Sequence, residues 1–131
     1  MADKWKKHRL DGPAIEWEGG KKDWYVNGKL HRLDGPAIID TYGNKYYYHN
    51  GKLHREDGPA IEWENGGKKE WWVDGKRHRL NGPAIKCNGG YNVWIINDKR
   101  LNTKRVERWI EDNNINLKTK QHQALFMVMF G

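Results

Sequence analysis

A histidine followed by an arginine recurs at a regular spacing in this 131-residue chain, and both side chains can do chemistry. An imidazole can bind a metal ion or act as a general base, and a guanidinium can pair with carboxylates. Stacked repeats hold equivalent residues in a line and not around one point, so we expect no metal site here. The four pairs begin at His8, His31, His54 and His78, and each pair marks the start of one repeat unit of the chain.

A structural role fits four copies of one pair better than a catalytic role, because a catalytic base is needed only once. We expect each His to cap turn carbonyls and each Arg to pair with a nearby acid. The acids are Asp11, Asp34 and Asp57. The single cysteine, Cys87, stands where other units have tryptophan, and we interpret it as a small buried apolar residue. No phosphate loop, dinucleotide fingerprint or zinc spacing occurs, so we predict no enzyme and no cofactor.

The second unit differs most from the others and is the candidate binding site. Asp40 replaces Trp17 and Trp63, and His49 replaces valine or isoleucine. Two interpretations stay open: a recess for a polar ligand, or an inert Asp40–His49 hydrogen bond in the core. The candidate binding residues include aromatic neighbours in this unit and in adjoining units, which make good anchors. They are Tyr25, Asp40, Tyr42, Tyr46, Tyr48, His49 and Trp72.

The His-Arg pairs belong to repeats of 23, 23 and 24 residues, which predicts one small structural unit stacked in a line. In the first unit, residues 14–18 alternate apolar and polar side chains, Gly19-Gly20 is a hairpin-loop signal, residues 23–26 form a second strand, and Asn27-Gly28 is a tight turn. We therefore expect four tandem β-hairpins in one curved antiparallel sheet.

Pairing across a two-residue Gly19-Gly20 loop predicts that Ile15 lies opposite Trp24. One face then carries Ile15, Trp17, Trp24 and Val26, which we interpret as the core face. The other face carries a second aromatic column. That column is either covered by other parts of the chain or exposed as a stacking platform. Its members are Tyr25, Tyr48, Trp72 and then Ile95.

The segment from Trp24 to Ala37 reads WYVNGKLHRLDGPA and returns, with four substitutions that include Asp74 and Asn81, from Trp71 to Ala84. This pattern resembles the MORN repeat, and most closely the MORN-variant repeats of phage and giant-virus proteins. The resemblance covers residues 8–101 and implies a rolled sheet with a binding or scaffolding role. The HR-x-DGPA segment departs from ordinary MORN repeats, so no lipid-binding residue is carried over.

The composition changes after Leu101, which predicts a separate C-terminal cap. Asn102 or Thr103 can cap a helix that continues to about Asp112, and residues 124–130 suggest a second short helix, with a strand as the alternative. We thus divide the chain into hairpin repeats over residues 1–101, with residues 1–7 as a partial cap, and a helical cap over residues 102–131. The last segment either packs on the fourth unit or forms a surface for a partner or a second copy.

The net charge of +7 is concentrated at the two ends, while residues 11–98 are neutral in sum. Nucleic-acid binding through the basic ends is therefore the weaker expectation. No apolar run suggests a membrane span or a signal peptide, which favours the cytoplasm, or the host cytoplasm for a viral protein. We expect a monomer or a homodimer that binds a host or viral protein, with counter-defence as the role that the resemblance implies. A small-molecule or nucleotide-binding protein is the alternative.

Overall fold

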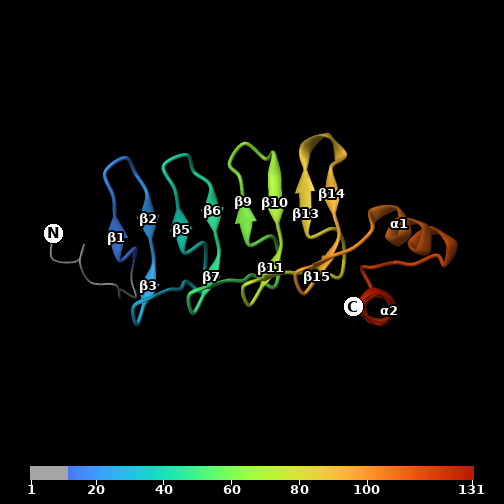
Figure 1. The fold of residues 1–131 in the computed structure, drawn as a ribbon. Helices are drawn as coiled ribbons and strands as arrows, with labels where there is room; N and C mark the ends of the chain where they lie inside the picture. The colour runs from blue at the N-terminus through green and yellow to red at the C-terminus, as the bar shows by residue number, and fades with distance from the viewer. Residues whose placement is uncertain (1–11) are drawn as a thin grey trace.

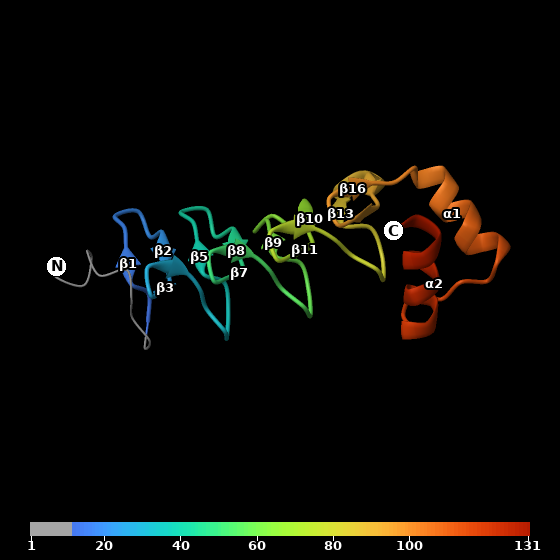
Figure 2. The ribbon, with the colours of Figure 1, turned by 60° about the horizontal axis from the view of Figure 1, so that its bottom comes forward.

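Four hairpin units stand side by side in chain order, and two helices follow the last unit. This computed structural model describes residues 12–131. Figure 1 and Figure 2 show the units in a row with both helices beyond the fourth. His8, Asp11 and the predicted partial cap of residues 1–7 lie outside the described residues.

Each unit consists of two hairpins, which Figure 1 shows one above the other and which we call the upper and the lower hairpin. The upper hairpins together form one eight-stranded antiparallel sheet, in which strands that follow one another among these hairpins are neighbours in space. The strands are very short because Gly-rich loops and the next bend limit each of them. They are β1 (Ile15–Glu16), β2 (Lys22–Asp23), β5 (Ile38–Ile39), β6 (Lys45–Tyr46), β9 (Ile61–Glu62), β10 (Lys68–Glu70), β13 (Ile85–Cys87) and β14 (Asn92–Val93). A 3-10 turn, η2 (Asn88–Gly90), joins the last two.

The lower hairpin of each unit is a separate two-stranded sheet that the sequence did not predict. The predicted antiparallel sheet of four tandem hairpins is present as the eight-stranded sheet. The chain leaves the large sheet at one aromatic residue per unit, for example Trp24. Asn27 and Gly28 both have positive φ, 52° and 77°, which is the backbone geometry that a two-residue hairpin turn requires. The strands are β3 (Tyr25–Val26), β4 (Lys29–Leu30), β7 (Tyr48–His49), β8 (Lys52–Leu53), β11 (Trp72–Val73), β12 (Lys76–Arg77), β15 (Ile95–Ile96) and β16 (Lys99–Arg100).

The upper hairpin has a different register from the predicted one. Ile15 pairs with Asp23, one position before the expected Trp24. Trp17 N–H donates to the Lys21 carbonyl at 2.8 Å, so the loop holds three residues and not two. A one-residue shift moves every side chain of the second strand to the other face, so Trp24 leaves the face that carries Ile15. Trp17, expected in the core, is 46% exposed at the loop end of the hairpin.

The observed register aligns one side chain from each strand in a continuous row across the large sheet. Every second member is an isoleucine, as the repeat predicts, and three of these four isoleucines are buried. The intervening members vary and include two buried carboxylates, Asp23 and Glu70. In order the row is Ile15, Asp23, Ile38, Tyr46, Ile61, Glu70, Ile85 and Val93. We call it the isoleucine row.

The C-terminal segment forms α1 (Thr103–Asp112) and α2 (Lys120–Phe130), which confirms the predicted helices. Asn102 caps α1, because its side chain accepts a hydrogen bond from Arg105 N–H at 2.9 Å. The largest buried cluster joins the fourth unit to both helices, so the segment is a cap on that unit. The cluster consists of Trp94, Ile96, Leu101, Val106, Leu117, Phe126 and Phe130. Over residues 12–131, neither helix has the length and apolar character needed to cross a membrane.

Candidate functional site

Asp40 organises the loop of the second upper hairpin. Its carboxylate accepts hydrogen bonds from the N–H groups of Tyr42 and Asn44, at 3.0 and 2.9 Å, and from the Tyr46 hydroxyl at 3.2 Å. Desolvation acts to raise the pKa of Asp40, but these bonds and those from Asn44 outweigh it, so the pKa is lowered. Asp40 therefore shapes this loop, and Tyr42 at its tip is 81% exposed.

His49 lies in the lower hairpin of the same unit, in β7. Its ring lies between those of His31 and His54, with centroids 4.6 and 5.7 Å away. Figure 1 shows β7 below β5, in a separate sheet, and no contact joins Asp40 to His49 among the described residues. The predicted recess and the predicted Asp40–His49 hydrogen bond are both wrong, because the bend at Tyr47 separates the two positions.

The second aromatic column is part of the packing. Tyr25, Tyr48 and Trp72 are half-buried, and Ile95 is buried. Desolvation, followed by the charge of Asp23, raises the pKa of Tyr25, and desolvation followed by Tyr25 raises that of Tyr48. Trp72 Nε1 donates to Glu70 at 3.1 Å. Of the predicted binding residues, Tyr42 is thus far more exposed than these three.

The repeated His residues join each unit to the next. The Nδ1 atoms of His31, His54 and His78 accept backbone N–H groups from the following lower turn, at 3.0, 3.0 and 3.1 Å. The expectation that each His caps a carbonyl is wrong, because an unprotonated Nδ1 is an acceptor. The donors are the positive-φ residues Asn50, Asp74 and Asn97.

The repeated Arg residues cover the aromatic residues at the bends. The Cζ atoms of Arg32, Arg55 and Arg79 lie 4.0, 3.9 and 3.7 Å from the rings of the preceding unit. These rings are Trp24, Tyr47 and Trp71. Arg32 and Arg55 also pair with Asp34 and Asp57, as predicted. The repeated His-Arg pairs therefore support the fold.

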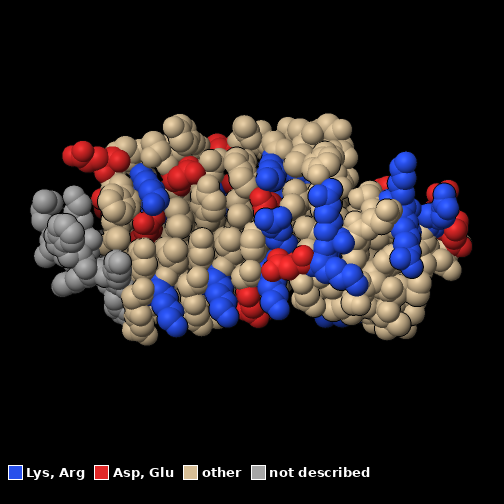
Figure 3. Space-filling view, viewed as in Figure 1, with Lys and Arg blue, Asp and Glu red and all other residues tan. Residues whose placement is uncertain are grey.

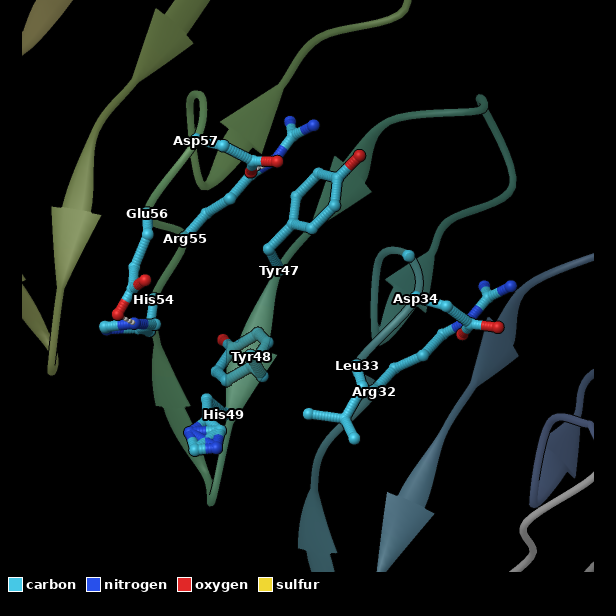
Figure 4. Close-up of a pocket in the computed structure, with 11 residues that line it drawn as sticks. Arg32, Leu33, Asp34, Tyr47, Tyr48, His49, His54, Arg55, Glu56 and Asp57 are labelled. Carbon is cyan, nitrogen blue, oxygen red and sulfur yellow. Dashed lines mark hydrogen bonds and ion pairs between the residues drawn. The ribbon is translucent and has the colours of Figure 1, made fainter.

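Clefts open between successive HR-x-DGP loops. The cleft between the second and third loops has a volume of about 630 Å³, and Figure 4 shows Tyr47 between an Arg32–Asp34 side and an Arg55–Asp57 side. Tyr48 and His49, two predicted site residues, also line it. A similar cleft of about 580 Å³ lies between the third and fourth loops, and Val73 is among the residues that line it. The first cleft is thus one copy of a repeated feature.

A groove of a different kind lies where units three and four meet. Its volume is about 400 Å³, its floor is apolar and its rim is charged. Sequence reasoning missed it, although Arg77 and Arg100 stand where the first two units have Leu30 and Leu53. The lining residues are Lys68, Arg77, Ile85, Cys87, Tyr91, Val93, Ile95, Asp98 and Arg100.

Charge is distributed unevenly along the molecule. Residues 12–75 hold nine Lys/Arg and 11 Asp/Glu, a formal charge of −2. Residues 76–131 hold 11 Lys/Arg and four Asp/Glu, a formal charge of +7. Figure 3 shows red and blue atoms mixed over the first units, with blue atoms gathered toward the fourth unit and the helices. The repeats are neutral only in sum, and the fourth unit is basic.

The basic end also exposes apolar side chains. Leu125, Val128 and Met129 on α2 are 48%, 81% and 50% exposed. Their spacing of three and four residues places them on one side of the helix, whereas Phe126 and Phe130 pack into the core. We call these three residues the α2 face.

The chain matches no protein-family model, no curated protein and no solved structure in the comparisons made. Among residues 12–131, no group of three or more His, Cys, Asp or Glu side chains could hold a metal ion. The function is therefore argued from the surfaces described above.

Proposed function

We propose that this chain is a non-enzymatic repeat-type binding protein that engages a protein partner through its C-terminal end. The observation that carries the proposal is the α2 face within a strongly basic part of the molecule. Apolar side chains left exposed together on one helix are typical of interaction surfaces. The hairpin units support the C-terminal end as a rigid scaffold.

The chemistry of the partner follows from the charges around α2. Lys118 and Lys120 lie at its N-terminal end, and Arg105 and Lys99 contact its last turn at Phe130. Such a surface attracts an acidic partner that offers apolar side chains to Leu125 and Val128. A second copy would bring two basic ends together, so we favour an acidic protein segment over a homodimer.

The wider setting rests on the resemblance of residues 8–101 to MORN-variant repeats. On that basis we propose a phage or viral protein that acts in the host cytoplasm, with counter-defence as its role. Nucleic-acid binding is the weaker alternative. The increase of positive charge toward one end favours weak and salt-sensitive binding to DNA or RNA without sequence preference.

A selection from a displayed random-peptide library tests this proposal without knowledge of the host. Acidic peptides with neighbouring apolar residues should be enriched on the full chain. Val128→Gln should weaken the selected peptides about tenfold, since it places a polar group at the centre of the contact. Leu33→Gln is the matched control, because Leu33 is 87% exposed on a loop of the second unit.

Three outcomes would contradict the proposal. The selected peptides could be basic or uncharged, or Leu33→Gln could weaken them as much as Val128→Gln. A sedimentation experiment could also show a dimer that Val128→Gln converts to a monomer, in which case the α2 face is a homodimer interface. Circular dichroism of both variants checks that they remain folded.

A further inference from the structure

We propose that the groove between units three and four binds a small acid, that is, an anionic group carried on a compact apolar body. This site lies on the hairpin repeats, separate from the α2 face, and takes a different class of ligand. Its evidence is the arrangement of an apolar floor, a cationic rim and one hydroxyl.

The apolar floor exists only in the fourth unit. Ile85, Val93 and Ile95 are 8%, 4% and 4% exposed. The position of Val93 in the isoleucine row holds Asp23, Tyr46 and Glu70 in the other units, each of which is polar. Cys87 likewise stands where the first and third units have Trp17 and Trp63. Smaller, apolar side chains therefore leave a hollow at this end that the other units fill.

The rim carries three cationic side chains, which differ in whether a nearby carboxylate neutralises their charge. Lys68 Nζ and Arg77 Nε lie 3.3 and 3.7 Å from the Glu70 carboxylate, which is buried beneath them. The fourth charged group, Asp98, accepts the backbone N–H of Arg77 at 2.8 Å. Arg100 forms no ion pair with a described residue, and its Nη2 donates to the Tyr91 hydroxyl at 3.3 Å.

Arg100 is thus the group best placed to receive an anion. Its guanidinium has free donors, and a charged group over an apolar floor interacts more strongly than one in open water. The ligand must bring an apolar body to cover Ile85 and Val93, because an anion alone would leave the floor in contact with water. The volume of about 400 Å³ suits up to three aromatic rings or a short chain.

Anilinonaphthalene sulfonate is a suitable first probe, because its fluorescence rises in an apolar site and it carries one anionic group. Phenylnaphthylamine has a similar apolar body without the charge and serves as the matched probe. The full chain should bind the sulfonate at least tenfold more tightly than the amine. Arg100→Gln should weaken the sulfonate about tenfold, and Arg77→Gln should weaken it less because Glu70 already shares that charge.

Lys76→Gln is the control for charge. It removes one cation from the same lower hairpin as Arg77, and Lys76 does not line the groove. It should leave the affinity unchanged. Val128→Gln is the control for location, because the α2 face could also bind the sulfonate. It too should leave the affinity unchanged, so this test can fail while the proposed protein-binding function stands.

The alkylation rate of Cys87 reports whether the probe occupies the groove, because Cys87 is the single cysteine and it lines the groove. Saturating sulfonate should slow alkylation of Cys87 by N-ethylmaleimide, as followed by intact mass. Naphthylacetate and naphthyl phosphate then compete for the site, and displacement by either identifies a carboxylate or a phosphate as the anion.

The proposal is overturned if the two probes bind equally, or if neither competitor displaces the sulfonate. It also fails if Lys76→Gln weakens binding as much as Arg100→Gln. An alkylation rate of Cys87 that saturating sulfonate does not change would place the probe outside the groove and overturn the proposal. Loss of the probe fluorescence in Val128→Gln would place the probe on the α2 face and also overturn it.

Discussion

At the scale of single residues, His31, His54 and His78 link the units through an Nδ1 atom that accepts a hydrogen bond. Each described Nδ1 accepts a turn N–H from the next unit, and a protonated imidazole cannot accept that bond. Desolvation lowers the pKa of His78, and desolvation together with the nearby His49 lowers that of His31, in both cases below the usual 6.5. The links that His31 and His78 make are therefore sensitive to acid.

We predict that the free energy of unfolding falls as the pH is lowered below 6.5. The unfolded chain then binds more protons than the folded chain, because the folded pKa values of His31 and His78 are the lower ones. Urea unfolding at several pH values measures this slope. His49→Val should reduce the slope of the unfolding free energy against pH. The same variant should leave the free energy of unfolding at pH 7.5 unchanged or raise it. A free energy that is constant or rises between pH 7 and pH 5 would contradict the prediction.

At the scale of elements, the isoleucine row decides how well each hairpin packs. Asp23 in this row is 3% exposed, and its Oδ1 has no hydrogen-bond partner. Its Oδ2 accepts Trp17 Nε1 at 3.0 Å and lies 3.6 Å from Lys21 Nζ. A buried carboxylate with an unpaired oxygen costs free energy.

We predict that Asp23→Val stabilises the protein by about 1 kcal/mol, because the fourth unit already holds Val93 at this place in the row. Trp17 is exposed enough for water to replace its lost hydrogen bond. Glu70→Val is the control: it removes the partner of Trp72 Nε1 and of two cations, so a smaller gain or a loss is expected. A lower melting temperature for Asp23→Val than for the native chain would show that the carboxylate is required.

At the scale of the whole molecule, the cap replaces the unit that would come next. Where each repeat continues with His-Arg, the fourth continues with Leu101-Asn102. Leu101 enters the buried cluster, and Asn102 caps α1. Phe126 then packs edge-on against Trp94 at 5.6 Å, on the ring that an arginine covers in the other units.

We predict that Phe126→Ala destabilises the protein by about 3–5 kcal/mol, since Phe126 is fully buried. Stacked units pass stability mainly to their neighbours, so the fourth unit should unfold first. Hydrogen exchange should show the largest loss of protection in residues 85–101. Val128→Ala, on the exposed side of the same helix, should change little. Uniform loss along all units would instead indicate one cooperative core.

The sequence by itself determined the number of units, the lower Asn-Gly turns, the buried isoleucines and the first helix from Thr103 to Asp112. Each follows from local physics: φ preferences at Asn-Gly, apolar periodicity and an Asn cap. Only the tertiary structure decided the hairpin register, because Gly19-Gly20 permits loops of two or three residues and the choice depends on pairing between units. It also separated Asp40 from His49, since the bend at Tyr47 is a matter of packing. The groove between units three and four also depends on tertiary structure, which brings Arg100 of β16 beside Tyr91 and Val93 at β14.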